Sequence, residues 1–393
     1  MSNTTNAANL ANSKLFKVFL ILTGATPMLS TDFYLPALPV ITEYFRTDAA
    51  ATNMSMIVFT IAIAVCSLIW GPISDKYGRR PVIIFGGALY FAGSLLCAFA
   101  PSIEWFVIFR LLQGMGGGAA FMASTAFVKD VFVLNQQERI LSIVQGMALI
   151  GPAIAPTIGA AILKIGSWHG IFILMTAMGA AIFAGALVIP ETLRSPLTGT
   201  LPATFARLWV VFRNPRFATV VVIYSLPAVP IMAFINASPY IFQNRFGVSE
   251  QAFSLYFAAS ALAMMAGTFS YASVSRRIGR TAVTYVCLGV MAVCGALILV
   301  AGGASPFALI SFIVPASFVS SMAKPISVYL GLNAQEGDTG SAASLIGFLS
   351  LMFASLGMSL LGLFEDYLWG VGFLYLLFGV VEALFFALLL KRV

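Results

Sequence analysis

Long apolar segments alternate with short polar segments along the whole chain. Each apolar segment has about 20 residues, the length that a helix needs to cross the hydrocarbon core of a bilayer. A lone strand in lipid would leave its backbone groups unpaired, so the pattern predicts helices throughout. The expected spans are residues 15–38, 50–72, 81–100, 103–126, 140–163, 168–190, 217–241, 251–274, 281–302, 305–330, 341–363 and 367–390.

Composition leads to the same interpretation. Of the 393 residues, 60% are hydrophobic and only 9% are charged, whereas soluble domains carry about 25% charged residues. So little polar surface excludes a soluble two-domain enzyme. The net charge of +7 would raise the question of nucleic acid in a soluble protein. In a membrane protein it indicates basic loops on one side, so we expect lipid as a partner and no nucleic acid.

The basic residues predict the orientation in the membrane. With the N-terminus inside, three Lys and Arg fall in outer loops, namely Arg46, Lys164 and Arg245. Two fall within spans, Arg110 and Lys324. The other sixteen lie in inner segments: Lys14, Lys17, Lys76, Arg79, Arg80, Lys129, Arg139, Arg194, Arg207, Arg213, Arg216, Arg276, Arg277, Arg280, Lys391 and Arg392. This asymmetry predicts that both termini are cytoplasmic.

Few residues suit catalysis or metal binding. The four cysteines lie inside apolar runs without a CxxC pair, and the chain has one histidine, His169. No HExxH, GxSxG or GxxxxGK[ST] motif is present. We therefore expect no enzyme activity, no metal site and no cofactor, and ATP is not expected to be the direct energy source.

The chain divides into two halves. Residues 191–216 form the longest connection and contain three prolines and four arginines. They separate a predicted six-helix bundle at 1–190 from another at 217–393. The sequence Gly71-Pro-Ile-Ser-Asp-Lys-Tyr-Gly-Arg79 returns in degraded form as Ala272-Ser-Val-Ser-Arg-Arg-Ile-Gly-Arg280. Two related parallel halves are typical of transporters, so we expect two pseudo-symmetric six-helix bundles.

The first motif follows span two and reads Gly71-Pro-Ile-Ser-Asp75-Lys-Tyr-Gly78-Arg79-Arg80-Pro. Gly71 and Gly78 allow close helix approach and a tight turn. Asp75 can accept hydrogen bonds from an arginine or from helix-end amides, which suits a conformational switch. The arginines alone would also suit ordinary inner-face charges.

The second motif, in span four, reads Arg110-Leu-Leu-Gln113-Gly-Met-Gly-Gly-Gly118. An arginine inside an apolar helix is costly and usually functional. Alternatively, Arg110 bonds backbone carbonyls of span one and is structural.

The third motif, in span five, places small residues and prolines along one helix. Small residues four or five apart make a groove for a neighbouring helix, and prolines bend the helix. Its residues are Gly146, Gly151, Pro152, Pro156 and Gly159.

The fourth motif, in span one, reads Ser30-Thr-Asp32-Phe-Tyr34-Leu-Pro-Ala-Leu-Pro39. Asp32 is the only carboxylate well inside the first six spans. Burial disfavours its charge and a nearby Arg110 favours it, so titration in the working range is possible. The alternative is a permanent Asp32–Arg110 ion pair that only joins spans one and four.

These motifs resemble the major facilitator superfamily (MFS). The third motif resembles the antiporter motif of drug:proton exporters, and the fourth resembles the bicyclomycin/chloramphenicol-resistance (Bcr/CflA) subgroup. Some relatives carry a second acid where this chain has Gly24, so the substrate need not be cationic. The resemblance implies a central cavity lined by spans one, four, seven and ten. Candidates for substrate contacts are Tyr34, Gln113, Asn236 and Tyr240.

The implied function is proton-coupled efflux of small amphiphilic molecules by alternating access, driven by the proton gradient with Asp32 and Arg110 as the coupling residues. The alternative is a dedicated exporter of a metabolite such as a siderophore or amino acid. Partners are a small-molecule substrate and protons, and the protein is expected to be a monomer in the bacterial inner membrane. Two further ionisable residues lie in spans, Lys324 and Glu382. Lys324 either lines the cavity or snorkels, and Glu382 is expected to pair with Lys391 or Arg392.

Overall fold

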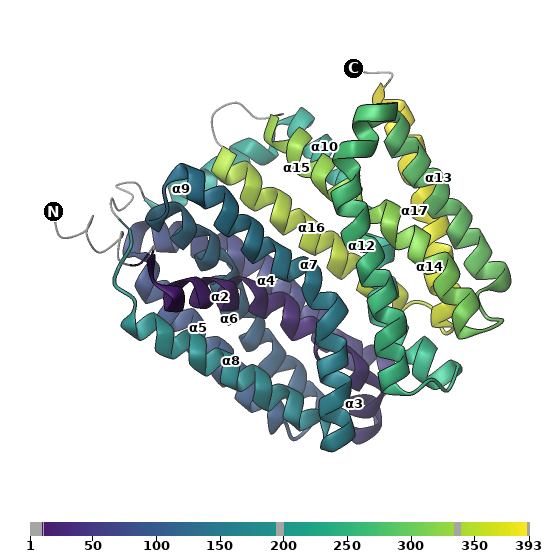
Figure 1. The fold of residues 1–393 in the computed structure, drawn as a ribbon, viewed down its shortest axis with the longest axis horizontal. Coiled ribbons are helices and arrows are strands. Elements are labelled where there is room, and N and C mark those ends of the chain that lie inside the picture. Colours follow the sequence, from purple (N-terminus) through teal and green to yellow (C-terminus); the bar gives the residue numbers. More distant parts are fainter. Residues whose placement is uncertain (1–9, 11, 194–199, 334–338, 391–393) are drawn as a thin grey trace. The chain divides into compact units, whose positions relative to one another are not determined.

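The computed structural model describes residue 10 and residues 12–193, 200–333 and 339–390 (Figure 1). Every regular element in these residues is helical. The chain divides into two compact units, Met1–Arg207 and Leu208–Val393. The division falls inside the 191–216 connection.

The first unit contains one broken helix followed by five long ones. Span one consists of α2, a short 3₁₀ turn (η1) and α3. The elements are α2 (Lys14–Asp32), η1 (Leu35–Ala37), α3 (Leu38–Tyr44), α4 (Ala49–Tyr77), α5 (Arg79–Ala98), α6 (Ile103–Val131), α7 (Leu134–Ile165) and α8 (Trp168–Val188). A further helix, α9 (Leu201–Phe212), crosses the boundary between the units.

The second unit begins with another broken helix. Its first span combines α10, α11 and a π-helical turn, η2. The elements are α10 (Pro215–Ser225), α11 (Ala228–Pro239), η2 (Tyr240–Arg245), α12 (Glu250–Ile278), α13 (Arg280–Ala301), α14 (Pro306–Ser321), α15 (Ala323–Asn333), α16 (Thr339–Leu361) and α17 (Tyr367–Leu390).

Ten helices in the described residues are long and apolar enough to cross a membrane, and two shorter apolar helical stretches accompany them, Ile150–Ile165 within α7 and Pro306–Ser321, which is α14. The all-helical prediction is confirmed. The count of twelve spans stays a prediction, because the predicted spans five and ten correspond to these shorter helices.

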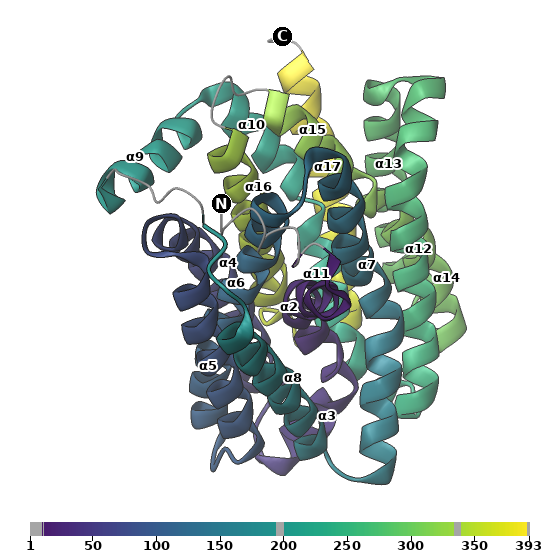
Figure 2. The ribbon, with the colours of Figure 1, turned by 60° about the vertical axis from the view of Figure 1, so that its left-hand side comes forward.

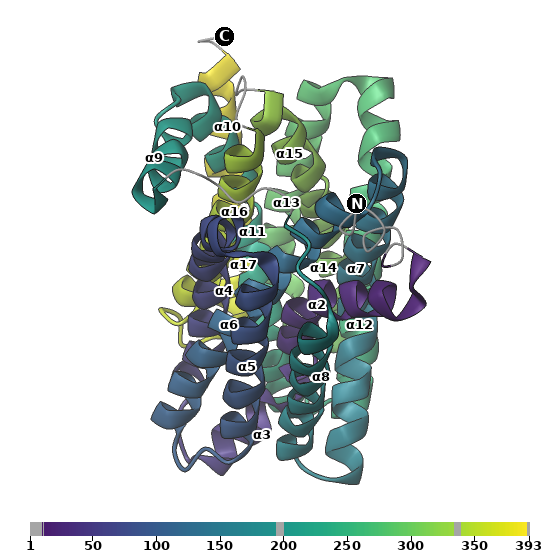
Figure 3. The same ribbon diagram turned by 90° about the vertical axis from the view of Figure 1, so that its left-hand side faces the viewer.

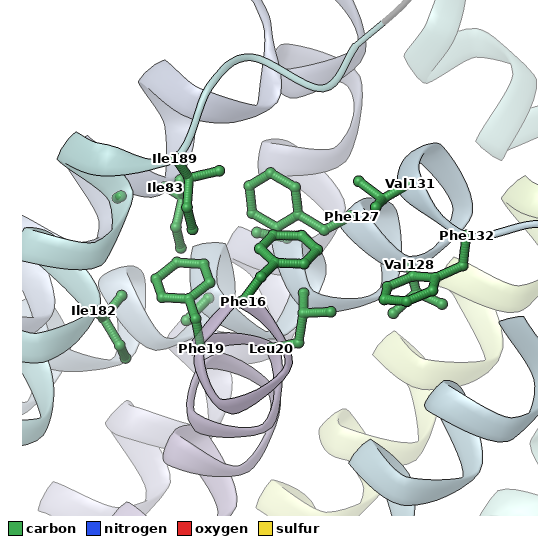
Figure 4. Packing of buried hydrophobic residues seen from close by; sticks show 13 residues of the cluster. Phe16, Phe19, Leu20, Ile83, Phe127, Val128, Val131, Phe132, Ile182 and Ile189 are labelled. Carbon is green, nitrogen blue, oxygen red and sulfur yellow. The ribbon is translucent and has the colours of Figure 1, made fainter. Parts of the chain in front are cut away.

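Aromatic packing forms the core of the first unit. Figure 4 shows Phe16 and Phe19 of α2 pointing toward Phe127 of α6. The ring centroids of Phe16 and Phe127 lie 6.1 Å apart at 79°, an edge-to-face arrangement that aromatic pairs favour. Ile83 of α5 and Ile182 of α8 complete the cluster. Helix α2 therefore packs among its neighbours, and Figure 3 shows it beside α7 and α8.

Helices α12, α13 and α14 lie side by side in the second unit (Figure 2). Helix α17 packs along α13, and α11 packs against α16. These contacts bury side chains such as Tyr375 and Met291.

The sequence repeat has a structural counterpart. Gly78 ends α4 with φ +108°, and Gly279 ends α12 with φ +84°. The backbone N–H of each glycine donates to the carbonyl four residues earlier, at Ser74 and Ser275. Left-handed backbone favours glycine, so the same tight turn joins the second and third helices of each unit.

Candidate functional site

Span one breaks at Asp32. Helix α2 ends at this residue, and η1 begins three residues later at Leu35. The Asp32 side chain is 7% exposed. Among the described residues, no hydrogen bond or ion pair involves its carboxylate. An ionised carboxylate in this position would be buried without a counter-charge, which is costly.

Two glycines of α7 pack against this break. A Cβ atom on Gly151 would lie 3.0 Å from Cδ2 of Leu29 and 3.9 Å from Oδ2 of Asp32. A Cβ atom on Gly159 would overlap the backbone carbonyl of Phe33. The small residues predicted from the third motif therefore bring α7 against the Asp32 turn. Gly146 also lies on α7, but in a part whose side chains lie outside the description.

Arg110 of α6 is completely buried in the first unit. Its guanidinium carbon lies 3.9 Å from the ring centroid of Phe59, 4.7 Å from that of Tyr34 and 5.9 Å from that of Phe172. These aromatic faces supply favourable cation–π contacts. Nη1 donates a hydrogen bond to Gln113, whereas Nε and Nη2 have no hydrogen-bond partner.

Arg110 does not pair with Asp32, since no ion pair joins them. The hypothesis of a permanent Asp32–Arg110 bridge is therefore wrong for this conformation. The alternative that Arg110 bonds carbonyls of span one is also wrong for this conformation, because its hydrogen bond goes to the Gln113 side chain and its contact with span one is with the Tyr34 ring.

A series of hydrogen bonds between side chains with hydroxyl and amide groups lies beside Arg110. Nε2 of Gln113 donates to Oγ of Ser94 over 2.8 Å, and Oγ of Ser94 donates to the carbonyl of Tyr90 over 2.7 Å. The hydroxyl of Tyr90 forms a hydrogen bond with that of Ser30, which lies two residues before Asp32 on α2. This series of hydrogen bonds links α6 and α5 to the helix that carries Asp32.

Tyr34 and Gln113 are both fully buried. The hydroxyl of Tyr34 bonds Oγ of Ser55 over 2.5 Å. In this structure both residues support Arg110, and a direct contact with substrate stays a prediction.

The turn between α4 and α5 contains a cluster of charges. Nε of Arg79 donates to Oδ2 of Asp130 over 3.0 Å, and Nη1 donates to Oγ of Ser74 over 2.6 Å. Arg79 also pairs with Asp75, whose side chain is 42% exposed. Asp75 is therefore partly exposed, and Arg79, with which it pairs, is also held by Asp130.

The surroundings of Gly71 do not match the expected close approach of another helix. No atom lies within 4 Å of the position that a Cβ atom would take there, so the structure shows no close helix approach at this glycine. Gly78, by contrast, forms the predicted tight turn with φ +108°.

Glu191, which follows α8 in the first unit, was not among the residues predicted from the sequence. Its carboxylate accepts hydrogen bonds from the backbone N–H groups of Arg79, at 2.9 Å, and Arg80, at 3.1 Å. These are orphan donors of the first turn of α5, so Glu191 caps that helix. The next residue, Thr192, donates to Asp130 over 3.3 Å. The only available signal was an acid directly after span six.

In the second unit, Tyr240 lies in the wall of an open cavity of about 370 Å³. Its ring centroid is 5.6 Å from that of Tyr367 at 75°. Arg245 and Asp366 also line this cavity and form an ion pair with N–O distances of 2.6 and 2.7 Å. Asn236 is buried and does not line it.

The Asp366 carboxylate lies in the loop before α17. Partial burial raises the pKa of Asp366, but hydrogen bonds from Arg245 and from the backbone N–H groups of Trp369 and Leu368 outweigh this effect. The pKa of Asp366 therefore lies below its usual value.

A family model described as Major Facilitator Superfamily matches residues 20–350. The chain therefore belongs to this superfamily, which indicates a transporter and not an enzyme. The solved structure of a D-xylose–proton symporter has a similar fold, with a TM-score of 0.68 and 16% identity over 94% of this chain and 97% of the symporter.

Curated relatives extend the comparison. The chain is 28% identical over 360 residues to the multidrug resistance protein MdtL of Shewanella oneidensis, covering 89% of this chain and 90% of the relative. It is 29% identical over 257 residues to MdtL of Escherichia coli, covering 64% and 65%. It is also 27% identical to an uncharacterized MFS-type transporter, YdgK of Bacillus subtilis, covering 100% and 99%.

Proposed function

We propose that this protein is a proton-coupled multidrug efflux antiporter that works by alternating access. The observation that carries the proposal is the environment of Asp32. Its carboxylate is buried at a helix break without a counter-ion among the described residues, next to the α7 glycines of the antiporter motif. The similarity to MdtL multidrug resistance proteins supports the substrate class.

The mechanism follows from the cost of a buried charge. In the conformation described, protonation of Asp32 removes the unpaired charge. Release of the proton needs water or a substrate group beside the carboxylate. A substrate that enters from the cytoplasm then competes with the proton, and protonation from outside resets the carrier. Arg110 is the second proposed coupling residue, a buried positive charge in the same unit that forms no ion pair with Asp32 in this conformation.

The finer assignments of the proposal come from the sequence. The span-one motif supports membership of the Bcr/CflA subgroup, and the excess of basic residues in one set of loops supports cytoplasmic termini. We further assign twelve spans, two six-helix halves at 1–190 and 217–393, the bacterial inner membrane and a monomeric state. Asp75, Arg79 and Arg80 are proposed to act at the conformational switch, with the turn at Gly78 as its pivot.

A drug-susceptibility panel in an efflux-deficient host tests the function. Wild type should raise resistance to several amphiphilic compounds, and Asp32→Asn should remove this resistance while the protein level stays the same. Glu43→Gln is the matched control, because Glu43 is an exposed acid on α3 in the same span. It should leave resistance unchanged.

Proteoliposomes test the coupling. An imposed proton gradient should drive uptake of a panel compound in wild type but not in Asp32→Asn, which should still bind the compound. If Asp32→Asn still pumps against a gradient with unchanged pH dependence, Asp32 is not the coupling site. If no panel compound is exported but a metabolite is, the protein is a dedicated exporter.

A further inference from the structure

A small cavity lies inside the second unit, between α10, α13, α14 and the start of α15, with α17 on one side. Its volume is about 20 Å³, which is room for one water molecule. Most of its wall is apolar, but four polar side chains also line it: Tyr224, Thr284, Ser320 and Glu382. None of these residues belongs to the site around Asp32.

Glu382 is the unusual member of this wall. It extends from α17, is 1% exposed, and its Oε1 has no hydrogen-bond partner. No ion pair within the described residues involves it. The pairing expected with Lys391 or Arg392 concerns residues that lie outside the description. An ionised carboxylate in this wall would carry a large desolvation cost, whereas the neutral acid would need only hydrogen bonds.

The hydroxyl groups in the wall suit a bound water. Oγ1 of Thr284 donates to the carbonyl of Arg280 over 3.0 Å and lies 3.5 Å from the hydroxyl of Tyr224. Oγ of Ser320 lies 3.3 Å from the sulfur of Met291, a weak acceptor. Each oxygen keeps acceptor capacity. A buried water needs two to four polar partners, and the carboxyl with these hydroxyls can supply them.

The titratable groups around Glu382 come from several elements. Tyr224 of α10 and Cys287 of α13 line the cavity. Tyr271 of α12 and Arg280 at the start of α13 lie close enough to Tyr224 to act on it electrostatically. Helix α14 contributes only Ser320 among polar side chains, and α15 contributes Ala323. Lys324 follows Ala323, and its side chain lies outside the description.

We propose that this cavity is a second proton-binding site, in which Glu382 is held as the neutral acid by one water molecule bound with Thr284 and Ser320. Binding forms an O–H bond on the carboxylate. Release breaks that bond and transfers the proton to the cavity water as hydronium, leaving the carboxylate charged. The site stands on the cavity geometry and not on the proposed transport function, so either can fail alone.

Infrared difference spectroscopy of the purified full-length protein tests the proposal through the carbonyl band of a protonated carboxyl group. Incorporation of ¹³C-glutamate separates glutamate bands from aspartate bands. A labelled protonated-carboxyl band should be present at neutral pH and be lost in Glu382→Gln. It should persist in Glu365→Gln, which alters an exposed glutamate, and in Asp32→Asn. Absence of the labelled band, as an ion pair with Lys324 would cause, or its persistence in Glu382→Gln, overturns the proposal.

Two variants keep Glu382 in place and remain informative if Glu382→Gln fails to fold. Thr284→Val and Ser320→Ala each remove one hydroxyl from the cavity wall. Each should shift the frequency of the labelled band, because the water that bonds the acid loses a partner. Unchanged band positions in both variants would show that the hydroxyl-bound water does not hold Glu382.

Discussion

Gly159 of α7 lies directly against the backbone carbonyl of Phe33, so closely that a Cβ atom on the glycine would overlap the carbonyl oxygen. Phe33 is the C-cap residue of α2, immediately after Asp32. The position of α7 is therefore coupled to the backbone of the turn that carries the proposed coupling acid. Movement of either helix must displace the other.

Gly159→Ala should therefore destabilise the first unit. The added methyl group forces α7 away from Phe33, and overpacking of this kind costs about 1–3 kcal/mol. Thermal unfolding in detergent should show a lower midpoint, and drug resistance should fall. Gly71→Ala is the matched control, since no atom lies within 4 Å of the added Cβ. Equal midpoints for the two variants would contradict the steric role of Gly159.

Glu191 gives a second prediction through its hydrogen bonds to the N–H groups of Arg79 and Arg80. Glu191→Ala should cost about 1 kcal/mol, the usual effect of losing a helix cap. Glu191→Gln keeps one acceptor oxygen and should retain part of the stability. Hydrogen exchange should speed up in the first turn of α5 in Glu191→Ala. Unchanged exchange there would show that Glu191 does not cap the helix.

The helical fold was predictable because the length of an apolar run reports directly on a membrane span. The interruptions were not predictable. Pro27 lies within α2 and does not end it, whereas the helix ends at Asp32. The second unit similarly replaces a straight span seven with α10, α11 and the π-turn η2. Such breaks depend on packing against other helices, which a hydropathy pattern does not contain.

Residues of the candidate site could be predicted from the sequence only where a charged residue stands in an apolar run. Arg110 and Asp32 are charged residues in apolar runs, so each is conspicuous in the sequence. The aromatic partners of Arg110 were not visible in this way, because phenylalanine and tyrosine are ordinary in a membrane helix. Glu191 acts on Arg79 from 112 residues away. Only tertiary structure brings such pairs together.

The Arg245–Asp366 ion pair should contribute modestly to stability. Both side chains are about half exposed, at 44% and 51%, so we expect a coupling of about 0.2–1 kcal/mol in a double-mutant cycle of Arg245→Gln and Asp366→Asn. The folded-state pKa of Asp366 is lowered. The contribution is therefore present above the ordinary aspartate pKa of about 3.9 and is lost as the pH falls through the lower folded-state pKa. A coupling that rises on acidification would contradict this assignment.

Arg110→Lys tests whether the flat guanidinium matters beyond its charge. Lysine keeps the positive charge but cannot stack broadly on Phe59 and Tyr34, and its compact ammonium group is more strongly hydrated. We expect a lower unfolding midpoint and at least about a tenfold loss of proton-driven transport, equivalent to about 1.4 kcal/mol. Arg245→Lys replaces a half-exposed arginine, so it should change the unfolding midpoint and the rate of proton-driven transport less than Arg110→Lys does. Full transport by Arg110→Lys would show that charge alone suffices.

Asp75→Ala separates a switch role from a folding role. Arg79 keeps Asp130 and Ser74 as partners when Asp75 is removed, and Asp75 is 42% exposed, so the loss of stability should stay below about 1 kcal/mol. If Asp75 acts in the conformational switch, turnover in proteoliposomes should nevertheless fall several-fold while substrate affinity is retained. Asp130→Asn is the comparison, because it removes the acid that holds Nε of Arg79 in the less exposed part of the cluster. It should lower the unfolding midpoint more than Asp75→Ala does. Normal turnover in Asp75→Ala would exclude Asp75 from the mechanism and leave Arg79 and Asp130 as a structural pair.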